Sequence, residues 1–193
     1  MEKSDETLMR EHQQGNPAAL EELFGRYKLK LFNFAYRILS DRAEAEDVTA
    51  ELFLTLITKA GSYEPRAKFS TWVYAVVRNG CVSKIRRRRS LVFFSQRPEK
   101  EEGEEGQWEP VGGEPGPDEQ AERKDRAGWV QAALKNLPLP QREAIVLMEY
   151  QGLSYAEIGE VLHCSLDNVK VMIFRARESL RKELAPILEE RPS

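Results

Sequence analysis

The sequence predicts an all-α protein with two small helical domains joined by a flexible acidic linker, the second domain containing a helix-turn-helix. Apolar residues recur with a period near 3.6 on both sides of the linker, and no β-type alternation of useful length is present. Residues 98–118 contain eight acidic side chains, five Gly and four Pro, so they offer almost nothing to bury. We therefore expect domains at 1–97 and 119–193, with 98–118 as a disordered linker.

The first long helix is predicted to begin at Asn16 and Pro17. Asn is a favoured N-cap residue, and Pro is favoured at the first helical position because its fixed φ suits the helix. The apolar residues that follow at helical spacing are Leu20, Leu23, Phe24, Tyr27, Leu31, Phe34 and Ile38. This spacing predicts one continuous helix with a buried stripe.

A second helix is predicted to follow almost immediately. Asp41 and Glu44 have the three-residue spacing of a capping box, in which each side chain binds the other residue's backbone N–H. The apolar stripe behind this cap consists of Ala45, Val48, Leu52 and Leu56, and Gly61 ends it. The sequence therefore predicts a helix that approaches Gly61.

A third helix is predicted after an interruption at Tyr63–Ser70. It starts at Thr71, runs through Ile85 and ends in Lys84–Arg89, where five of six residues are cationic. Cations at successive positions point all around a helix and repel one another unless an anion neutralises them. The run therefore favours nucleic acid as a partner, although a solvated tail or a processing signal remains an alternative.

The helix-turn-helix is predicted from two caps separated by a short turn. Ser154 and Glu157 form a second capping box, and Ser165 offers a new cap after the turn. A buried stripe then follows, made of Val169, Ile173, Ala176 and Leu180. The opposite side presents Lys170, Val171, Phe174 and Arg175, a mixture of cations and apolar groups that suits the DNA major groove. The alternative is an amphipathic hairpin whose basic side is only solvated.

Charge and composition exclude several classes of function. The net charge is −3, but one Lys against eight acids gives the linker −7, which leaves +4 on the rest of the chain and favours polyanion binding. Cys81 and Cys164 are far apart, and the histidines are His12 and His163, so we expect neither a metal site nor a cofactor. No run of 18 apolar residues and no signal-peptide pattern occurs, which predicts a cytoplasmic protein without direct membrane insertion.

Two blocks of motifs resemble a known family. The first block comprises Ala45-Glu46-Asp47-Val48, Glu51-Leu52-Phe53, Phe69-Ser70-Thr71-Trp72, Arg78-Asn79 and the Arg-rich helix end. The second comprises Leu137-Pro138, Gln141-Arg142, Leu153-Ser154-Tyr155-Ala156-Glu157-Ile158 and Phe174-Arg175-Ala176-Arg177-Glu178-Ser179-Leu180-Arg181. In this order, the blocks resemble the second and fourth regions of extracytoplasmic-function (group 4) sigma factors of the sigma-70 family.

The resemblance implies a dissociable subunit of bacterial RNA polymerase that selects promoters and helps to open them, and that is not an enzyme. The implied partners are core RNA polymerase and promoter DNA, without a small-molecule substrate. Relatives are often held by an anti-sigma factor, and the long linker here would permit such wrapping.

The resemblance also implies three sets of site residues. Polymerase binding is assigned to Asp47, Glu51, Phe53 and Leu54. Binding of the minus-10 element is assigned to Arg66, Lys68, Trp72, Asn79, Lys84, Arg86, Arg87 and Arg88. Binding of the minus-35 element is assigned to Ser165, Lys170, Val171, Phe174, Arg175 and Arg177.

Two other functions are weighed against this one. A stand-alone helix-turn-helix regulator would need a dimer interface to read paired half-sites, and the sequence has no spare apolar helix for one. A nucleic-acid-processing enzyme would need a metal-binding carboxylate cluster or an activated nucleophile. The candidate carboxylates are Asp41, Glu44, Glu46, Asp47 and Glu51, but they fall on one helix without a phosphate loop or a partner His.

Overall fold

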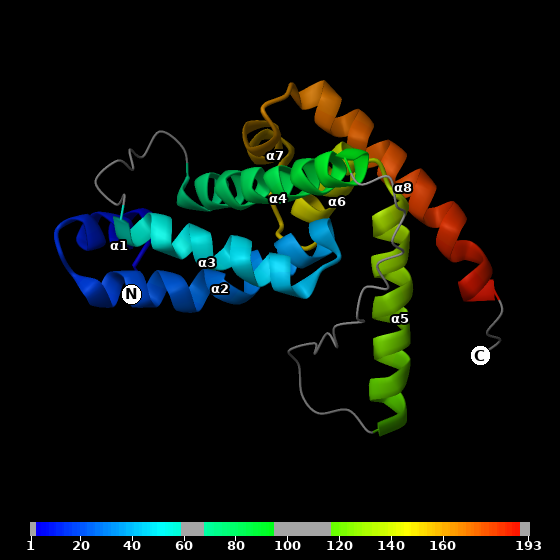
Figure 1. The fold of residues 1–193 in the computed structure, drawn as a ribbon, viewed down its shortest axis with the longest axis horizontal. Coiled ribbons are helices and arrows are strands. Elements are labelled where there is room, and N and C mark those ends of the chain that lie inside the picture. Colours follow the sequence, from blue (N-terminus) through cyan, green and yellow to red (C-terminus); the bar gives the residue numbers. More distant parts are fainter. Residues whose placement is uncertain (1–2, 59–67, 95–116, 190–193) are drawn as a thin grey trace.

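The computed structural model describes residues 3–58, 68–94 and 117–189, and every regular element in these ranges is an α-helix. The helices are α1 (Asp5–Gln13), α2 (Pro17–Leu39), α3 (Arg42–Thr58), α4 (Phe69–Phe94), α5 (Pro117–Asn136), α6 (Leu139–Glu149), α7 (Tyr155–Leu162) and α8 (Leu166–Glu189). Figure 1 shows α4 lying across α2 and α3, with α7 beside α4, and α6 packs on α2. The predicted all-α class is confirmed.

Two of the predicted helix starts have the expected caps. Asn16 Oδ1 accepts a hydrogen bond from the N–H of Ala18 at 3.2 Å, and Pro17 is the first helical residue. Asp41 Oδ1 accepts from the N–H of Glu44 at 2.9 Å. The side chain of Glu44 binds Arg88 of α4, so tertiary contacts engage the second half of the predicted box.

The sequence reasoning missed α1 and placed the start of α4 two residues late. Ser4 caps α1 by accepting from the N–H of Thr7 at 3.2 Å, a local signal that was present in the sequence. Helix α4 begins at Phe69, whose N–H is bound by the carboxylate of Glu6 from α1. The start of α4 thus depends on a residue far away in the chain.

Helices α1 to α4 share an aromatic core. Phe34 lies edge-to-face with Tyr74 at 5.5 Å, and Tyr27 lies edge-to-face with Phe69 at 5.4 Å, measured between ring centroids. Gly80 lets α4 approach α3 closely, since a Cβ at this position would lie 2.8 Å from Cγ1 of Val48. Burial of these rings fixes the direction of α4 relative to α2 and α3.

Helices α7 and α8 form the predicted helix-turn-helix. Both hydrogen bonds of the Ser154–Glu157 capping box are present, and α7 ends at His163 in the left-handed conformation with φ of 54°. Ser165 Oγ accepts from the N–H of Asn168 at 3.3 Å and caps α8. The predicted stripe is buried at Val169, Ile173 and Ala176 and partly buried at Leu180.

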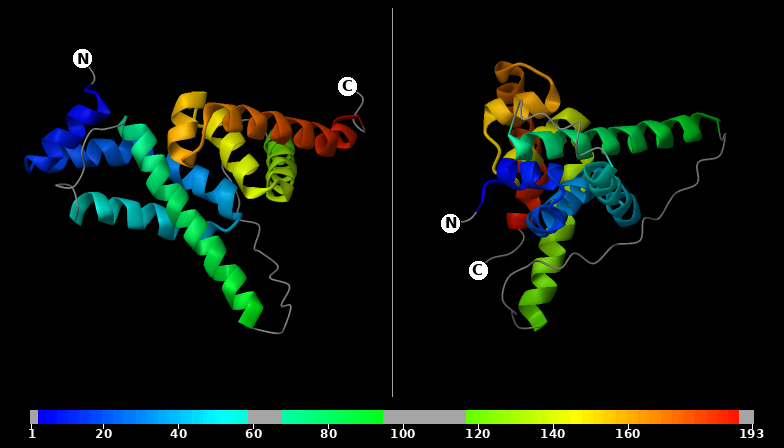
Figure 2. Two further views of the ribbon diagram at one scale, coloured as in Figure 1. Left: turned by 90° about the horizontal axis from the view of Figure 1, so that it is seen from above. Right: turned by 90° about the vertical axis from the view of Figure 1, so that its left-hand side faces the viewer.

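The first half of the chain, α1 to α4, packs against the second half, α5 to α8. The sequence did not indicate this contact. Helices α5 and α6 contact α2, and α7 contacts α4, so that buried residues from both halves form one hydrophobic cluster. Figure 2 shows this packing from two further directions. The predicted linker lies outside the described residues except for Pro117 and Asp118, which are the first residues of α5.

The described residues were also compared with the features of a membrane-spanning helix and of a metal site. Among the helices that the structure describes, none is long and apolar enough to cross a membrane. The described residues likewise contain no group of three or more His, Cys, Asp or Glu placed to hold a metal ion.

Candidate nucleic-acid interface

The outward face of α8 is exposed along its first three turns. Lys170, Val171, Phe174 and Arg175 all lie on the surface, and the Phe174 side chain is 68% exposed. Leu166, which the sequence analysis did not single out, extends this apolar surface. An exposed aromatic ring between cations has little stabilising contact within the chain, so this face is available for a partner.

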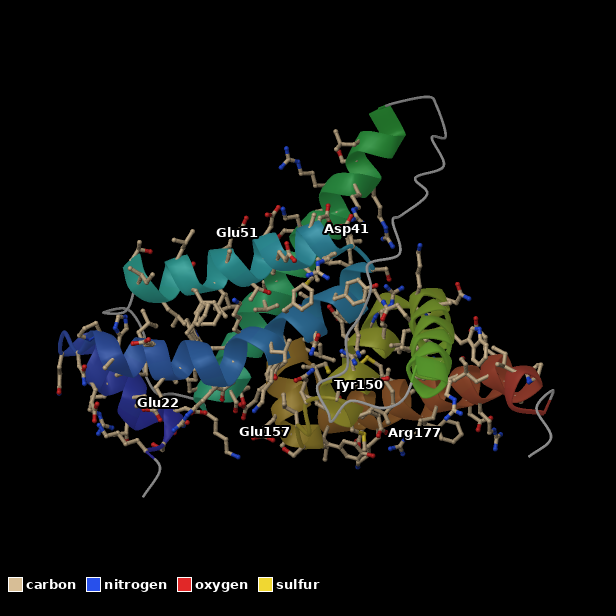
Figure 3. All side chains as sticks on the ribbon, turned by 90° about the horizontal axis from the view of Figure 1, so that it is seen from below. Glu22, Asp41, Glu51, Tyr150, Glu157 and Arg177 are labelled. Atoms are coloured by element: carbon tan, nitrogen blue, oxygen red, sulfur yellow. The ribbon has the colours of Figure 1, made fainter. Side chains whose placement is uncertain are left out.

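Two predicted minus-35 residues also have roles within the fold. Ser165 is exposed, but its hydroxyl caps α8. Arg177, labelled in Figure 3, binds Glu149 at the end of α6, with Nη2 and Oε1 2.7 Å apart. This hydrogen bond raises the pKa of Arg177. The ion pair connects α8 to α6.

The five cations at the end of α4 separate into two groups. Lys84 Nζ lies 3.2 Å from Asp47 Oδ2, and Arg88 Nη2 lies 2.7 Å from Asp41 Oδ2. Arg88 also pairs with Glu44. Lys84 and Arg88 are four residues apart, so both face α3. These two predicted minus-10 residues therefore also bind α4 to α3.

The other cations of this run remain exposed. Arg86, Arg87 and Arg89 lie on the surface, and within the described ranges none of them has an acidic partner. The end of α4 that bears them projects beyond the neighbouring helices in Figure 2. Three nearby guanidinium groups without an acidic partner among the described residues are chemically suited to a polyanion.

Three other predicted minus-10 residues lie in the first half of α4 or directly before it. Lys68 is exposed and pairs with Glu157 of α7, with Nζ and Oε1 2.8 Å apart. Trp72 is partly buried against Phe69, at 6.1 Å between ring centroids. Asn79 is exposed further along the helix, and Arg66 lies outside the described residues. When the two halves pack together, which we call the docked arrangement, Lys68 is therefore paired with an acidic residue of the second half.

Glu157 is the electrostatic link between α4 and α7. Its carboxylate accepts hydrogen bonds from Lys68 and from the N–H and the hydroxyl of Ser154. These bonds, with Lys68 contributing most, lower the pKa of Glu157 to about 2. The ionised form is therefore strongly favoured, and its stabilising contribution is present above the usual pKa of 4.5 and is lost as pH falls through about 2.

We predict that Lys68→Met raises the pKa of Glu157 towards its usual value, because the largest cause of the lowered pKa is removed. The bonds from Ser154 remain and should keep the pKa somewhat below that value. An NMR titration of the Glu157 carboxyl group measures the change. Lys170→Met is the matched control, since Lys170 pairs with Asp167 instead. An unchanged Glu157 midpoint in Lys68→Met would show that the ion pair is not formed in solution.

The residues of α3 that are predicted to bind polymerase differ in their exposure. Asp47, Glu51 and Leu54 are exposed and follow each other at helical spacing, with Leu54 59% exposed. Phe53 is 7% exposed and packs edge-to-face against Phe24, with ring centroids 4.6 Å apart. Its prediction as a surface contact is corrected, since successive residues on a helix point about 100° apart. Ile57 is the exposed apolar residue that extends this face.

A buried ion pair joins α4 to α6 across the contact between the two halves. Arg78 Nε and Nη2 donate to the two carboxylate oxygens of Glu143 at 3.0 and 3.3 Å. The Glu143 side chain is 1% exposed, and burial raises its pKa while Arg78 opposes that change. The sequence contained one signal for this pair, because Glu143 directly precedes the apolar run Ala144–Leu147.

The end of α2 is capped by side chains from the second half. The last four carbonyls of a helix have no partner within it, and α2 ends at Leu39. The Ser40 N–H donates to the carbonyl of Tyr36. Gln131 of α5 donates to the carbonyls of Tyr36 and Arg37, and Arg142 of α6 donates to that of Ile38 at 2.7 Å. Nearby, Arg37 stacks on the ring of Tyr150, which Figure 3 labels. The negative end of the α2 dipole therefore attracts α6.

Comparison with known families agrees with this architecture. The sigma-70 region 2 family matches residues 23–91, which include α3 and most of α4. The sigma-70 region 4 family matches residues 127–180, which include α6, α7 and the exposed face of α8.

The similarity to known proteins extends over nearly the whole chain. RNA polymerase sigma-H factor of Pseudomonas aeruginosa is 29% identical over 98% of this chain and 98% of its own length. The extracytoplasmic-function sigma factor SigM of Mycobacterium tuberculosis is 30% identical over 95% of this chain and 86% of its own length. The sigma factor RpoE of Bartonella quintana, solved in complex with the anti-sigma factor NepR, superposes with a TM-score of 0.65. It is 25% identical, with 86% of this chain and 96% of RpoE covered.

Two family regions in the expected order, together with full-length similarity to named members, determine the class of this protein. Sigma factors of this class are transcription initiation factors and bind core RNA polymerase and promoter DNA. The chain belongs to the extracytoplasmic-function RNA polymerase sigma factors of the sigma-70 family.

Proposed function

We propose that this sigma factor uses three separate faces to start transcription: α3 binds core polymerase, α4 holds the opened minus-10 element and α8 reads the minus-35 duplex. The observation that supports this division is the exposure of Arg86, Arg87 and Arg89 on α4 and of Arg175 on α8, which have no acidic partner among the described residues of a chain of net charge −3. The chain acts by binding rather than by catalysis, and its partners locate it in the bacterial cytoplasm.

The role of α4 follows from the chemistry of single-stranded DNA. Capture of an unpaired strand needs cations along the phosphate backbone and an aromatic group on which a base can stack. Arg86, Arg87 and Arg89 supply the cations at one end, while Trp72 and Lys68 lie towards the other. We infer that the strand lies along α4 between these two groups.

The role of α8 follows from the chemistry of the major groove. Lys170 and Arg175 can donate to guanine edges or phosphates, while Val171 and Phe174 can contact thymine methyl groups. Helix-turn-helix proteins place the first residues of the second helix against base edges. The exposed residues Lys170, Val171, Phe174 and Arg175 occupy that part of α8, and Ser165 caps it.

The role of α3 follows from its combination of charge and apolar surface. Asp47 and Glu51 provide negative charge, and Leu54 and Ile57 provide exposed apolar area beside it. Such a face suits a basic partner helix, because the charges orient the encounter and the apolar groups are buried on contact. In the view of Figure 3, Glu51 and Arg177 of α8 lie on opposite sides of the molecule, so polymerase binding and minus-35 reading need not compete.

We also infer that an anti-sigma factor regulates this protein. The similar RpoE of Bartonella quintana was solved in complex with the anti-sigma factor NepR. A chain whose two halves pack together offers such a partner one continuous surface to bind.

A test of the α8 assignment uses Arg175→Ala in the reconstituted polymerase holoenzyme. We expect the variant to lose about 1–3 kcal/mol of binding to duplex promoters, through relaxed discrimination at one or two positions of the minus-35 element. The measurement is competitive binding to a promoter library at fixed salt. Arg181→Ala is the control, since it removes a cation from the same helix beyond the recognition face. Unchanged discrimination in Arg175→Ala would contradict the assignment.

A further inference from the structure

Helix α1 lies ahead of the residues that match sigma-70 region 2, yet it is firmly attached to them. Leu8 and Met9 are buried in the core. Asp5 binds Arg26 of α2, with Oδ1 2.6 Å from Nη1, and it also accepts a hydrogen bond from the hydroxyl of Tyr27. Because Arg26 and Tyr27 belong to the central helix, α1 has a fixed position in the fold.

From this position α1 contacts the first residue of α4. Glu6 Oε1 accepts a hydrogen bond from the backbone N–H of Phe69 at 3.0 Å. The first N–H groups of a helix have no partner within it, and a carboxylate is favoured there by the helix dipole. The residue before α4 is Lys68, which has no side-chain acceptor with which to cap the helix. Glu6 therefore provides a cap that the local sequence lacks.

The same helix also contacts the last turn of α3. His12 Nε2 lies 3.2 Å from the carbonyl oxygen of Leu56, and α3 ends at Thr58. A carbonyl can only accept, so Nε2 is the donor. Helix α1 thus binds the end of α3 and the start of α4, the two helix ends between which residues 59–67 connect.

The contact of Glu6 acts on the residues assigned to strand capture. Phe69 is fully buried and packs against Trp72, and Lys68 directly precedes it. A shift of the Phe69 backbone would therefore move both Lys68 and the Trp72 ring. Single-strand capture depends on such groups being held in place before the DNA arrives.

We propose that Glu6 is a positioning residue for promoter opening, which holds α4 so that Lys68 and Trp72 meet the unpaired minus-10 strand. This role rests on the proposed function of α4. It extends the strand-capture machinery to a helix outside the matched region.

The test compares Glu6→Ala, Glu6→Gln and Glu21→Ala in the holoenzyme formed with core polymerase. The probe is a fluorescent single-stranded oligonucleotide bearing the minus-10 sequence of a promoter that the wild-type holoenzyme opens. We expect Glu6→Ala to weaken binding about tenfold, since one hydrogen bond to a charged group is lost. Glu6→Gln should recover most of the lost affinity for the oligonucleotide, because its amide oxygen can accept the same hydrogen bond from the Phe69 N–H. Glu21 is exposed on α2 without an assigned contact, so Glu21→Ala should match the wild type.

Core affinity and the unfolding temperature are measured on the same variants. A loss of oligonucleotide binding with unchanged core affinity, restored by Gln, supports positioning. Equal binding by Glu6→Ala and Glu21→Ala overturns the proposal, as does a loss of core affinity in parallel or a loss that Gln does not restore. Trp72→Ala separates this proposal from the proposed function of α4. If Trp72→Ala leaves oligonucleotide binding unchanged, the assignment of strand capture to α4 fails. If Trp72→Ala weakens binding and Glu6→Ala does not, only the role of Glu6 fails.

Discussion

Replacing both Arg86 and Arg87 with Ala is expected to abolish promoter opening while leaving the affinity for core polymerase unchanged. Both guanidinium groups are exposed and have no acidic partner within the described residues, so the fold loses no ion pair. Each phosphate contact contributes roughly one unit to the dependence of log K on log salt. The double variant should therefore show a salt slope smaller by about two.

Opening is measured by the fluorescence of a base analogue in the minus-10 element, and core affinity by co-elution. The matched control is Arg181→Ala with Lys182→Ala, which removes two exposed cations from the far part of α8. This control should leave opening nearly unchanged. A loss of core binding in the Arg86 and Arg87 variant would instead place the basic end of α4 against the polymerase.

The largest effect on stability is expected from Arg78→Ala. Glu143 is 1% exposed, whereas Arg78 is 22% exposed, so removal of the guanidinium leaves a buried carboxylate without its partner. Breaking a buried ion pair in this way costs roughly 3–5 kcal/mol. Glu143 regains water if α6 moves away from α4, so we expect the two halves to separate rather than each half to unfold.

Small-angle scattering and urea unfolding distinguish these outcomes. Separation should increase the radius of gyration of the free chain and divide a single unfolding transition into two. Arg42→Ala is the control, because it breaks an exposed pair with Glu46, whose side chains are 57% and 56% exposed. That pair contributes about 0–1 kcal/mol. Scattering and unfolding curves identical to those of the wild type in Arg78→Ala would show that the Arg78–Glu143 pair does not hold the halves together.

Separation of the two halves in Arg78→Ala should also change the surface that α4 offers to DNA. In the docked arrangement Lys68 is paired with Glu157, and Tyr74 of α4 donates to Gln151 of the second half at 2.6 Å. Loss of the Arg78–Glu143 pair should release both contacts together, because they join the same two surfaces. Arg78→Ala is therefore expected to expose the amino-terminal part of α4.

Much of the candidate site could be predicted from sequence where a local rule applies. The stripe of Val169, Ile173 and Ala176 is buried, so the helical period requires Lys170 and Phe174 to face outward, as they do. The same rule does not separate Phe53 from Leu54. Both are apolar neighbours on α3, and only the position of Phe24 on α2 decides which one is buried.

The basic run at the end of α4 shows the same limit. Five cations in the six residues Lys84–Arg89 predicted an anionic partner for this end of the helix. The structure divides them, because Lys84 and Arg88 face the carboxylates of α3 and of its cap. Which cations remain available depends on the crossing of α3 and α4, and no local pattern encodes that crossing.

The sequence by itself determined the helices with local caps, the buried stripes and hence the exposed face of α8, since caps and stripes depend on residues three or four positions apart. Only the tertiary structure decided that the two halves pack together, that α2 is capped by Gln131 and Arg142, and that Glu6 starts α4. Arg78 and Glu143 are 65 residues apart, and Glu6 and Phe69 are 63 apart. Such pairs form only after the core has brought distant helices into contact, so their energy is a property of the whole fold.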